Sequence, residues 1–260
     1  MCCAGSAEDY ITSKAVVLGG TRGLGLEIAR ALRDIQPIIV GSSEIDPAIK
    51  ESMPYAEFVR ADLRNPEVAA EKVLKAVSSN PLPLSAFYWV AGEYHRGPFV
   101  EEKYEKTASM TATHFLGPLS VLKAVHGFVK NQAQKTPYKL IVIGSVFVHK
   151  PGKNHATLSA LKAAKANFAR VFSYELSADL PGSMTLLVNP WAMQTHFFDG
   201  YEMDQKMMDK FMAPHEVARI ILDQEANLPK EAKPPIVELT LDRGENSSIK
   251  QLIGPQPVKH

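Results

Sequence analysis

Short apolar runs alternate with longer stretches of helical spacing along the chain. The runs, which predict buried strands, lie at residues 15–18, 37–40, 58–59, 87–90, 140–143, 184–188 and 236–241. Between them apolar residues recur every three or four positions, which predicts helices at 24–32, 66–77, 103–130 and 156–180. We expect the third helix to be bent or interrupted near Gly117–Pro118, because proline breaks the helical hydrogen-bond ladder. Continuous apolar strands separated by helices indicate an α/β, doubly wound fold, here a seven-stranded parallel sheet with helices on both faces.

One domain accounts for the whole chain, residues 1–260. This length suits a single large α/β domain, and an apolar content of 45% can fill a substantial core. Neither an internal repeat nor a linker interrupts the alternation. We predict tails at residues 1–12 and 251–260, the second of which contains two prolines.

Charge and composition exclude several classes of partner. A net charge of +1 without a basic stripe argues against nucleic acid. The apolar runs are far shorter than the roughly 20 residues that span a bilayer, so we expect no membrane segment. The start of the chain lacks the basic and apolar regions of a secretory signal. The only two cysteines, Cys2 and Cys3, are adjacent and would form a strained disulfide, so a cytoplasmic protein with free thiols is expected.

A glycine-rich turn joins the first predicted strand to the first helix. Such a turn lets the backbone approach a pyrophosphate, and the helix N-terminus adds N–H groups and a favourable dipole. In this context the pattern predicts a dinucleotide site rather than a merely structural turn. Its residues are Gly19, Thr21, Arg22, Gly23, Leu24 and Gly25.

The residues after the second strand favour NADP(H) over NAD(H). An NAD site places an acidic residue there to hold the ribose hydroxyls, but this chain has Gly41, Ser42 and Ser43. The first carboxylate is that of Glu44. Arg22, helped by the two serine hydroxyls, can therefore bind a 2′-phosphate.

The spacing of three further residues identifies a family. Ser145 follows a predicted strand, Leu158 comes thirteen residues later, and Lys162 lies one helical turn beyond Leu158 on the same face. A serine, a tyrosine and a lysine at these intervals are the catalytic set of the short-chain dehydrogenase/reductase family, whose fold is Rossmann-like. The chain resembles this family from end to end, with Leu158 in the place of the tyrosine.

Other motifs of the family are partly kept. The resemblance implies further cofactor contacts by Asp62, Leu63, Ala91, Gly92, Pro190 and Thr195, and by Lys162 through the nicotinamide ribose. Residues 89–92 read Trp-Val-Ala-Gly where the family has Asn-Asn-Ala-Gly, and Trp191 replaces a glycine. The methionine-rich stretch within residues 195–212 resembles the substrate lid of the family. No residues are assigned to a metal.

The missing tyrosine leaves the proton donor open. In the family the tyrosine exchanges a proton with the substrate oxygen, the serine orients the substrate, and an asparagine, here His114, holds a water beside the lysine. Losing a positioned general acid costs about 10²- to 10⁴-fold in rate. We assign catalysis to Ser145, Lys162 and His155, with His149, Tyr94, His95 and His114 as other candidate acids. Substrate contacts are expected from Tyr94, Phe147, His149, Leu158 and Trp191.

Three functions remain open for a small-molecule site of this kind. The preferred one is an NADPH-dependent reductase that acts on an activated C=C bond, because Ser145 and Lys162 could stabilise the enolate oxygen. The others are a non-redox isomerase, lyase or cyclase, and a catalytically silent NADP-binding sensor or partner subunit. A homodimer or homotetramer is expected, since the last long helix has surplus apolar side chains at Leu161, Phe168, Val171, Phe172 and Leu176.

Overall fold

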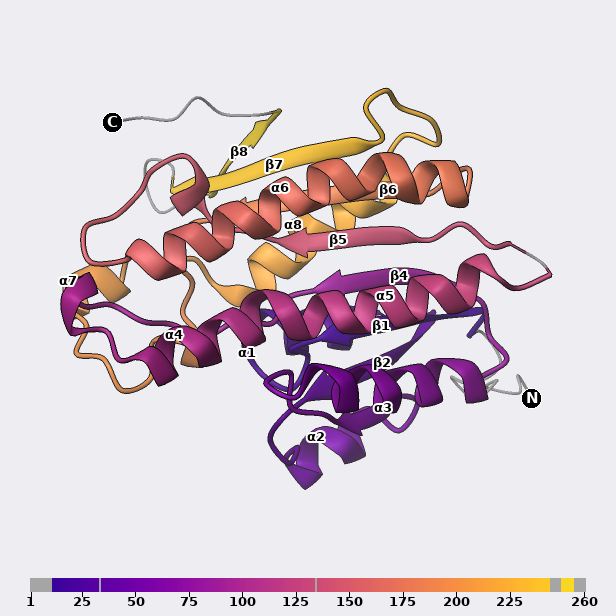
Figure 1. Cartoon of the computed structure of the whole chain (residues 1–260), viewed down its shortest axis with the longest axis horizontal. Coiled ribbons are helices and arrows are strands. Elements are labelled where there is room, and N and C mark those ends of the chain that lie inside the picture. The colour runs from indigo at the N-terminus through magenta and orange to yellow at the C-terminus, as the bar shows by residue number, and fades with distance from the viewer. Residues whose placement is uncertain (1–10, 33, 134, 244–248, 255–260) are drawn as a thin grey trace, which may run out of the picture.

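One eight-stranded sheet runs through the molecule in the order β3-β2-β1-β4-β5-β6-β7-β8 (Figure 1). The structure is a computed structural model that describes residues 11–32, 34–133, 135–243 and 249–254. The seven parallel strands are β1 (Ser13–Leu18), β2 (Ile35–Gly41), β3 (Glu57–Arg60), β4 (Leu84–Trp89), β5 (Lys139–Ile143), β6 (Met184–Pro190) and β7 (Ile236–Arg243). Each of the seven predicted apolar runs falls in or overlaps one of these strands.

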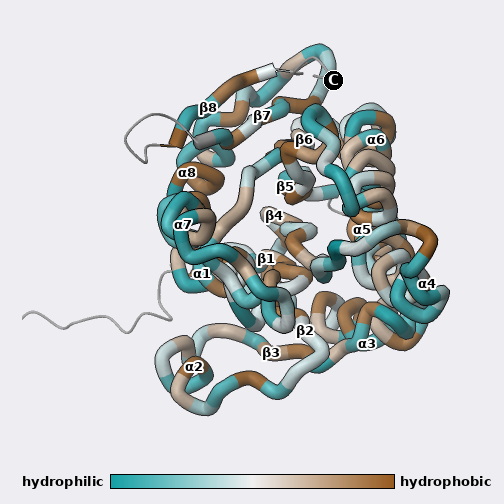
Figure 2. Tube along the Cα trace, turned by 90° about the vertical axis from the view of Figure 1, so that its left-hand side faces the viewer, coloured by the Kyte–Doolittle hydropathy of each residue, from teal (hydrophilic) through white to brown (hydrophobic). Residues whose placement is uncertain are grey.

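Helices cover both faces of the sheet (Figure 2). On one face lie α3 (Pro66–Ser79), α5 (Gly117–Lys130) and α6 (Ala156–Asp179), and on the other α1 (Gly23–Ala31) and α8 (Pro214–Ala226). Strand β1 shows why two layers form, since Val16 and Leu18 join the first apolar core while Ala15 and Val17 join the second. Alternate side chains of a strand point to opposite faces, so an uninterrupted apolar run requires a helix layer on each side. The doubly wound α/β fold is therefore as predicted.

The strand count differs from the prediction of seven. An additional strand, β8 (Ile249–Ile253), pairs antiparallel with β7 at the edge of the sheet. It includes residues 251–253, which were assigned to a tail. Only Ile249 and Leu252 are partly buried in β8, and so short a run at an edge carries little of the apolar signal on which strand prediction depends. Most of the N-terminal tail and residues 255–260 lie outside the described residues.

The predicted helix 103–130 is interrupted one turn earlier than expected. It consists of α4 (Tyr104–Thr111), a π-helical turn η3 (Ala112–Leu116) and α5, which starts at Gly117. A Cβ atom on Gly117 would lie 2.2 Å from the carbonyl oxygen of Leu63. The glycine therefore allows the helix to touch the loop after β3, and the wide turn before it places His114 inside the protein.

Five shorter elements and one longer helix are absent from the prediction. The short ones are α2 (Pro47–Ser52), α7 (Gln205–Met208) and the 3-10 turns η2 (Phe99–Glu101), η4 (Val146–Val148) and η5 (His196–Phe198). Helix α8 carries readable signals, namely Pro214 in its first turn and buried Val217, Ile220 and Ile221 at helical spacing. No helix among the described residues is long and apolar enough to cross a membrane.

The surplus apolar residues of α6 are fewer than predicted. Leu161 and Leu176 are buried within the chain, whereas Val171 is 55% exposed. Phe168 and Phe172 are half-buried, and their rings stack with centroids 5.3 Å apart. Of these five residues, only Val171 and the outer faces of the two phenylalanines therefore leave apolar surface exposed on α6.

Candidate active site

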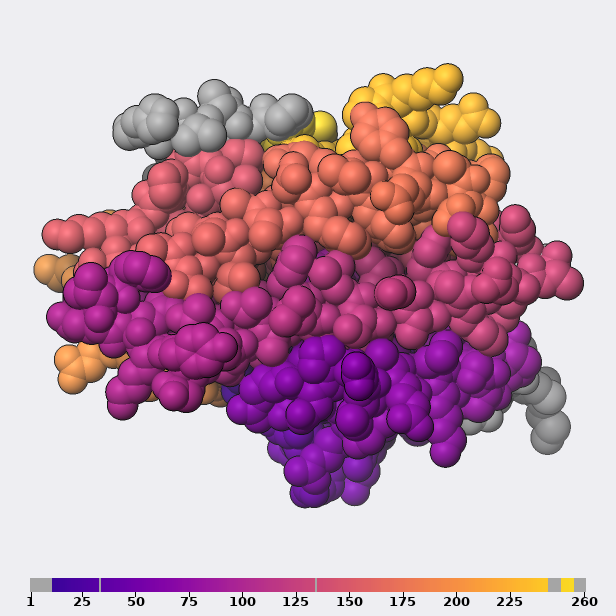
Figure 3. All heavy atoms as spheres, in the orientation of Figure 1, coloured from indigo at the N-terminus to yellow at the C-terminus, as the bar shows by residue number. Residues whose placement is uncertain are grey.

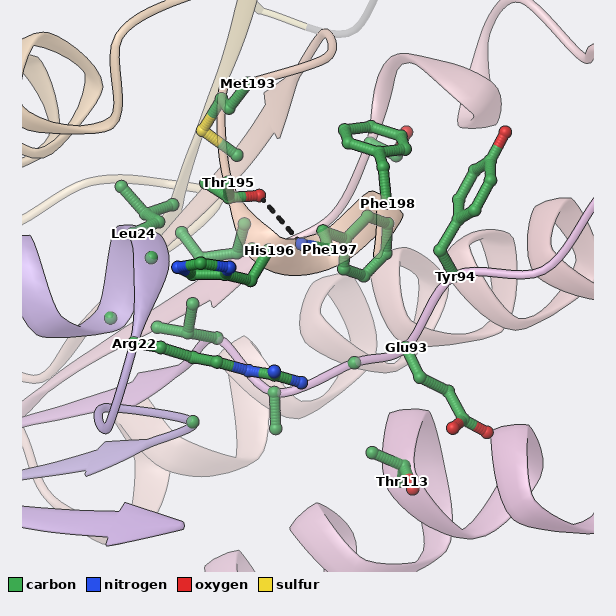
Figure 4. A pocket seen from close by; sticks show the side chains of 18 of the residues that line it. Arg22, Leu24, Glu93, Tyr94, Thr113, Met193, Thr195, His196, Phe197 and Phe198 are labelled. Carbon is green, nitrogen blue, oxygen red and sulfur yellow. Dashed lines mark hydrogen bonds between the residues drawn. The ribbon is translucent and has the colours of Figure 1, made fainter. Parts of the chain in front are cut away.

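A cavity of about 580 Å³ opens at the carboxyl ends of the parallel strands. Its walls come from the loops after β1, β2, β3, β4, β5 and β6, and from the start of α6. The strand order reverses between β1 and β4, and ligands of doubly wound folds bind at such a switch point. Figure 4 shows Arg22, Tyr94 and Thr195 reaching this space from three different loops.

The glycine turn forms a cradle that side chains would fill. A Cβ atom on Gly25 would lie 2.1 Å from the carbonyl oxygen of Gly19, and one on Gly19 would lie 2.8 Å from the backbone of Ala91. Gly19 and Gly23 also have φ angles of +82° and +55°, which favour glycine. Arg22, at the N-cap of α1, makes no capping hydrogen bond with its side chain. Backbone N–H groups at this helix start therefore suit the pyrophosphate of a dinucleotide.

The far end of the cavity is lined by Ser42 and Ser43, both exposed. The nearest carboxylate along the chain, Glu44, forms an ion pair of 2.9 Å with Arg60. Asp62 forms a bidentate pair with Arg64, whose hydrogen bonds hold the pKa of the Asp62 carboxyl below its usual range. The carboxylates of Glu44 and Asp62 are thus both paired with arginines.

Ser145 and Lys162 lie together at the reacting end of the cavity. Ser145 caps the turn η4, where its Oγ accepts a hydrogen bond of 3.2 Å from the N–H of Phe147. The Lys162 ammonium donates a 2.9 Å hydrogen bond to the carbonyl oxygen of Gly144, beside Ser145. Burial lowers the pKa of Lys162 to about 8. Both groups can therefore donate hydrogen bonds to an oxygen atom placed in the cavity.

Leu158 of α6 adds an apolar side chain to the cavity wall. It is 2% exposed and packs in one cluster with Tyr94, Met110 and Leu161. It also lines the cavity, one helical turn before Lys162. Helix α6 thus presents an apolar wall to the reacting end.

A hydrogen-bonded pair, Tyr94 and His155, stands beside this wall. The Tyr94 hydroxyl lies 2.9 Å from Nε2 of His155, whose Nδ1 lies 2.8 Å from the carbonyl oxygen of Lys153. Both side chains line the cavity. Burial raises the pKa of the Tyr94 hydroxyl and lowers that of the His155 imidazole. The pair therefore holds a phenol and a neutral imidazole at pH 7.

Two buried basic groups lie behind the cavity wall. His114, in the π-helical turn, contacts the backbone of Glu93 through Nε2, with 2.8 Å to the carbonyl oxygen and 3.0 Å to the nitrogen. Lys165 is completely buried, with Nζ 3.4 Å from the carbonyl oxygen of Ala91 and 4.9 Å from the ring centroid of Trp89. Burial lowers the pKa of both groups well below their usual values. Burial therefore favours the uncharged form of each group.

Aromatic and methionine side chains cover the rest of the reacting end. Phe197 lies with its ring centroid 5.9 Å from Nζ of Lys162, and Trp191 packs against Phe211 with ring centroids 5.7 Å apart. The segment 195–212 supplies several of them, from η5 and from the region around α7. The aromatic and methionine residues of this wall are Tyr94, Phe147, Trp191, Met193, Phe197, Phe198, Met203, Met207 and Phe211. Such a wall suits a flat apolar ligand.

The structure brings the predicted site residues to this cavity except His149 and two of the other candidate acids, His95 and His114. His149 is buried against Asn189, at 3.4 Å between His149 Nε2 and Asn189 Nδ2, and does not line it. Prediction missed Arg96 and His196 at the cavity, and Lys165 behind it. Lys165 was detectable, since it follows Lys162 by three residues and so lies on the same face of α6.

Comparison with known proteins agrees with this architecture. The family profile described as short chain dehydrogenase matches residues 13–198. The chain therefore belongs to the short-chain dehydrogenase family. No curated protein matches the sequence significantly.

Several solved structures share the fold. An alcohol dehydrogenase from the archaeon Thermococcus sibiricus, complexed with 5-hydroxy-NADP, is 21% identical, with a TM-score of 0.72 over 88% of this chain and 95% of that one. A short-chain dehydrogenase from Sphingobium yanoikuyae in complex with NADPH is 19% identical, with a TM-score of 0.72 over 87% of each chain. A 3-oxoacyl-[acyl-carrier protein] reductase from Brucella melitensis in complex with NAD is 19% identical, with a TM-score of 0.69 over 82% of this chain and 89% of that one.

Lys165 generates a prediction about stability and pH. Its pKa is lowered in the folded chain, whereas in the unfolded chain it is the ordinary value of about 10.5. The unfolded state therefore binds more protons below that pH, and this residue makes stability rise as the pH rises toward 10. We expect Lys165→Met to raise the free energy of unfolding by about 1–3 kcal/mol at pH 7, with a smaller gain at pH 9.5.

Urea denaturation at the two pH values measures both effects. Lys123→Met, at an exposed position of α5, is the control, and its effect should stay within about 0.5 kcal/mol. A Lys165→Met variant that is no more stable than the wild type at pH 7 would contradict the prediction.

Proposed function

We propose that the protein is an NADP(H)-dependent oxidoreductase that reduces an activated C=C bond, such as that of an enone, in a small hydrophobic molecule. The observation that carries the proposal is that Ser145, Lys162 and the apolar Leu158 line one cavity. We infer that Leu158 stands in the place of the family's proton donor. Carbonyl reduction requires a proton at the substrate oxygen. Reduction of a conjugated C=C bond requires only that the charge on this oxygen be stabilised while carbon is protonated elsewhere.

The cradle and the cavity fit a dinucleotide cofactor. The pyrophosphate would lie on the glycine turn and the start of α1, because only glycines leave room there. Asp62 and Leu63 would contact the adenine, while Lys162 would bind the nicotinamide ribose. The nicotinamide end would be bordered by Ala91, Gly92, Pro190 and Thr195, which line the same cavity. When bound, the reduced cofactor supplies a hydride.

The residues of the chain would divide the remaining work. Hydrogen bonds from the Ser145 hydroxyl and the Lys162 ammonium would hold the substrate oxygen and stabilise negative charge on it. The aromatic wall would orient a flat apolar substrate and exclude water. His155, the titratable residue at the start of α6, would serve as the proton source.

A second candidate function is a non-redox isomerase on the same site. The observation that favours it is the neutral state of the Tyr94–His155 pair, which can accept a proton from carbon without any hydride transfer. Both functions need the same stabilised enolate at Ser145 and Lys162. They differ in the need for a dinucleotide, so turnover by protein stripped of cofactor separates them.

The reductase proposal is tested with benzylideneacetone, a small aromatic enone. The wild type should oxidise NADPH in its presence and form benzylacetone. Lys162→Met should lower this rate by about 10²- to 10³-fold, as loss of an oxyanion donor does, while the variant stays folded because the methionine fills the same space. Absence of NADPH oxidation by the wild type with benzylideneacetone and cyclohexenone would refute the reductase. Conversion of either enone to an isomer of the same composition, by protein stripped of dinucleotide, would establish the isomerase class.

The preference for NADP(H) makes a prediction about affinity. Arg22 is exposed and reaches into the cavity, as Figure 4 shows, and Ser42 and Ser43 line the same cavity. Charge-assisted hydrogen bonds contribute about 1.5–3 kcal/mol, so Arg22→Ala should weaken NADPH binding by roughly 10- to 150-fold. NADH binding should hardly change. Calorimetric titration of both cofactors measures the difference.

Arg30 provides the matched control for this titration. It lies on α1, the helix that follows the glycine turn. It forms an ion pair of 3.1 Å with Glu27 and does not line the cavity. Arg30→Ala should therefore bind both cofactors as the wild type does. Equal losses of NADPH and NADH affinity in Arg22→Ala would show that Arg22 does not bind the 2′-phosphate.

We also propose that the protein assembles as a homodimer or homotetramer through α6. Helices α5 and α6 lie side by side across one face of the molecule (Figure 3). Val171 and Tyr174 of α6 are 55% and 59% exposed. Val171→Glu should convert the assembly to a monomer, whereas Val68→Glu, at a 52% exposed position of α3, should leave it intact. Sedimentation velocity at micromolar concentration checks this, and a monomeric wild type would contradict it.

A further inference from the structure

The hydrogen bonds of His155 determine which of its ring nitrogens carries the proton. Its Nδ1 lies 2.8 Å from the carbonyl oxygen of Lys153, and a carbonyl can only accept. In the neutral ring Nδ1 is therefore protonated and Nε2 is the acceptor. The Tyr94 hydroxyl, 2.9 Å from Nε2, consequently donates to it. The pair thus has a defined direction, from the phenol to the imidazole.

Packing holds Tyr94 in this arrangement. Its ring lies 4.8 Å from that of Phe198 and 4.9 Å from that of Tyr201, measured between centroids, and the residue is 8% exposed. Leu158 belongs to the same packed cluster. The phenol therefore sits next to the side chain that occupies the position of the lost donor, and both face the cavity.

We propose that Tyr94 is the catalytic proton carrier of this site and that His155 is the positioning residue that loads and unloads it. This inference rests on the proposed function, because it assigns the proton step that follows charge stabilisation by Ser145 and Lys162. The donor has thus moved from α6 to the loop after β4. His155 acts on the substrate only through the phenol, since the Tyr94 hydroxyl covers its free nitrogen.

The proton step balances in the reducing direction. With the hydride that a reduced nicotinamide dinucleotide would supply added at the β-carbon of the enone, the π electrons would move to the oxygen as an enolate. The Tyr94 O–H bond then breaks as a C–H bond forms at the α-carbon and the C=O bond is restored. In the same step the proton on Nε2 of a cationic His155 moves to the Tyr94 oxygen. Solvent returns a proton to His155, which is only partly buried.

When His155 is neutral at the start, the Tyr94–His155 pair can instead remove a proton from a bound ligand. The α-proton of a bound ketone moves to the Tyr94 oxygen while the phenol proton moves to Nε2. No hydride is involved, so this reaction is visible as exchange of the α-protons with solvent deuterium. The two directions require opposite protonation states of one imidazole.

The charged and titratable groups around the pair fix the sign of the pH dependence. Burial is the largest cause that lowers the pKa of His155, and Arg96 and His95 lower it further, while the Lys153 carbonyl raises it. Tyr201 and Arg96 face the phenol, and Tyr201 is itself 2.8 Å from Nδ1 of His95. Reduction needs the cationic form of His155, so its rate should fall as the pH rises through the lowered pKa of this imidazole, which is below 6.5. Exchange, which needs the neutral ring, should rise over the same range.

Two assays on three variants test the proposal. Reduction of benzylideneacetone by NADPH and deuterium exchange into benzylacetone are followed between pH 5 and pH 8. Tyr94→Phe keeps the packed ring and should lose about 10²- to 10⁴-fold in both assays. His155→Gln should be slow and nearly independent of pH, because the amide cannot titrate. Tyr201→Phe is the matched control, since that hydroxyl touches His95 and its residue does not line the cavity.

The outcomes separate this inference from the reductase proposal. Loss of both reactions in Tyr94→Phe but not in Tyr201→Phe, with opposite pH trends in the wild type, supports it. Unchanged reduction in Tyr94→Phe overturns it and leaves the reductase standing. If the wild type never oxidises NADPH but does exchange α-protons, and Tyr94→Phe loses this exchange, the role of Tyr94 as proton carrier is supported and the reductase is refuted. A wild type that neither reduces nor exchanges overturns both.

Discussion

The close approach of two backbone segments at the centre of the sheet is the contact on which the site depends. The carbonyl of Leu18, at the end of β1, accepts hydrogen bonds from the N–H groups of both Val90 and Ala91 after β4. The N–H groups of Gly19 and Gly20 are bonded in turn to the carbonyl of Val40, at the end of β2. Three strand ends are thereby joined where the strand order reverses. Glycine is required because a side chain at Gly19 would collide with Ala91, and the cavity opens directly above this junction.

The cost of burying cations constrains the reacting end. Lys162 and Lys165 both lie on one face of α6 in the interior, and no described carboxylate forms an ion pair with either. Burial lowers the pKa of both amines. The pKa of Lys165 lies well below its usual value, and that of Lys162 is about 8. Lys162 thus remains largely cationic at neutral pH, where an oxyanion would need it. The two lysines, three residues apart on one helix, show how burial lowers the pKa of each amine in the interior.

The architecture could be predicted from local apolar patterns, because apolar runs specify buried strands. The glycine turn could be read in the same local way, whereas the Ser145–Lys162 interval and most of the other cavity residues were predicted from the resemblance to the short-chain dehydrogenase family. The failures have physical causes. Strand β8 is too short and too exposed to produce a pattern, and His149 turns toward Asn189 rather than the cavity. The Tyr94–His155 contact joins residues 61 positions apart, a separation across which periodicity carries no information.

The shared packing of Leu158 and Tyr94 has a consequence for substitution at either position. Both side chains occupy one cluster with Met110 and Leu161, so a second aromatic ring at position 158 would crowd the first. Residues in one packed cluster do not contribute independently to stability. The cost of a larger side chain at position 158 therefore depends on which residue occupies position 94, and a smaller residue there would make room for it.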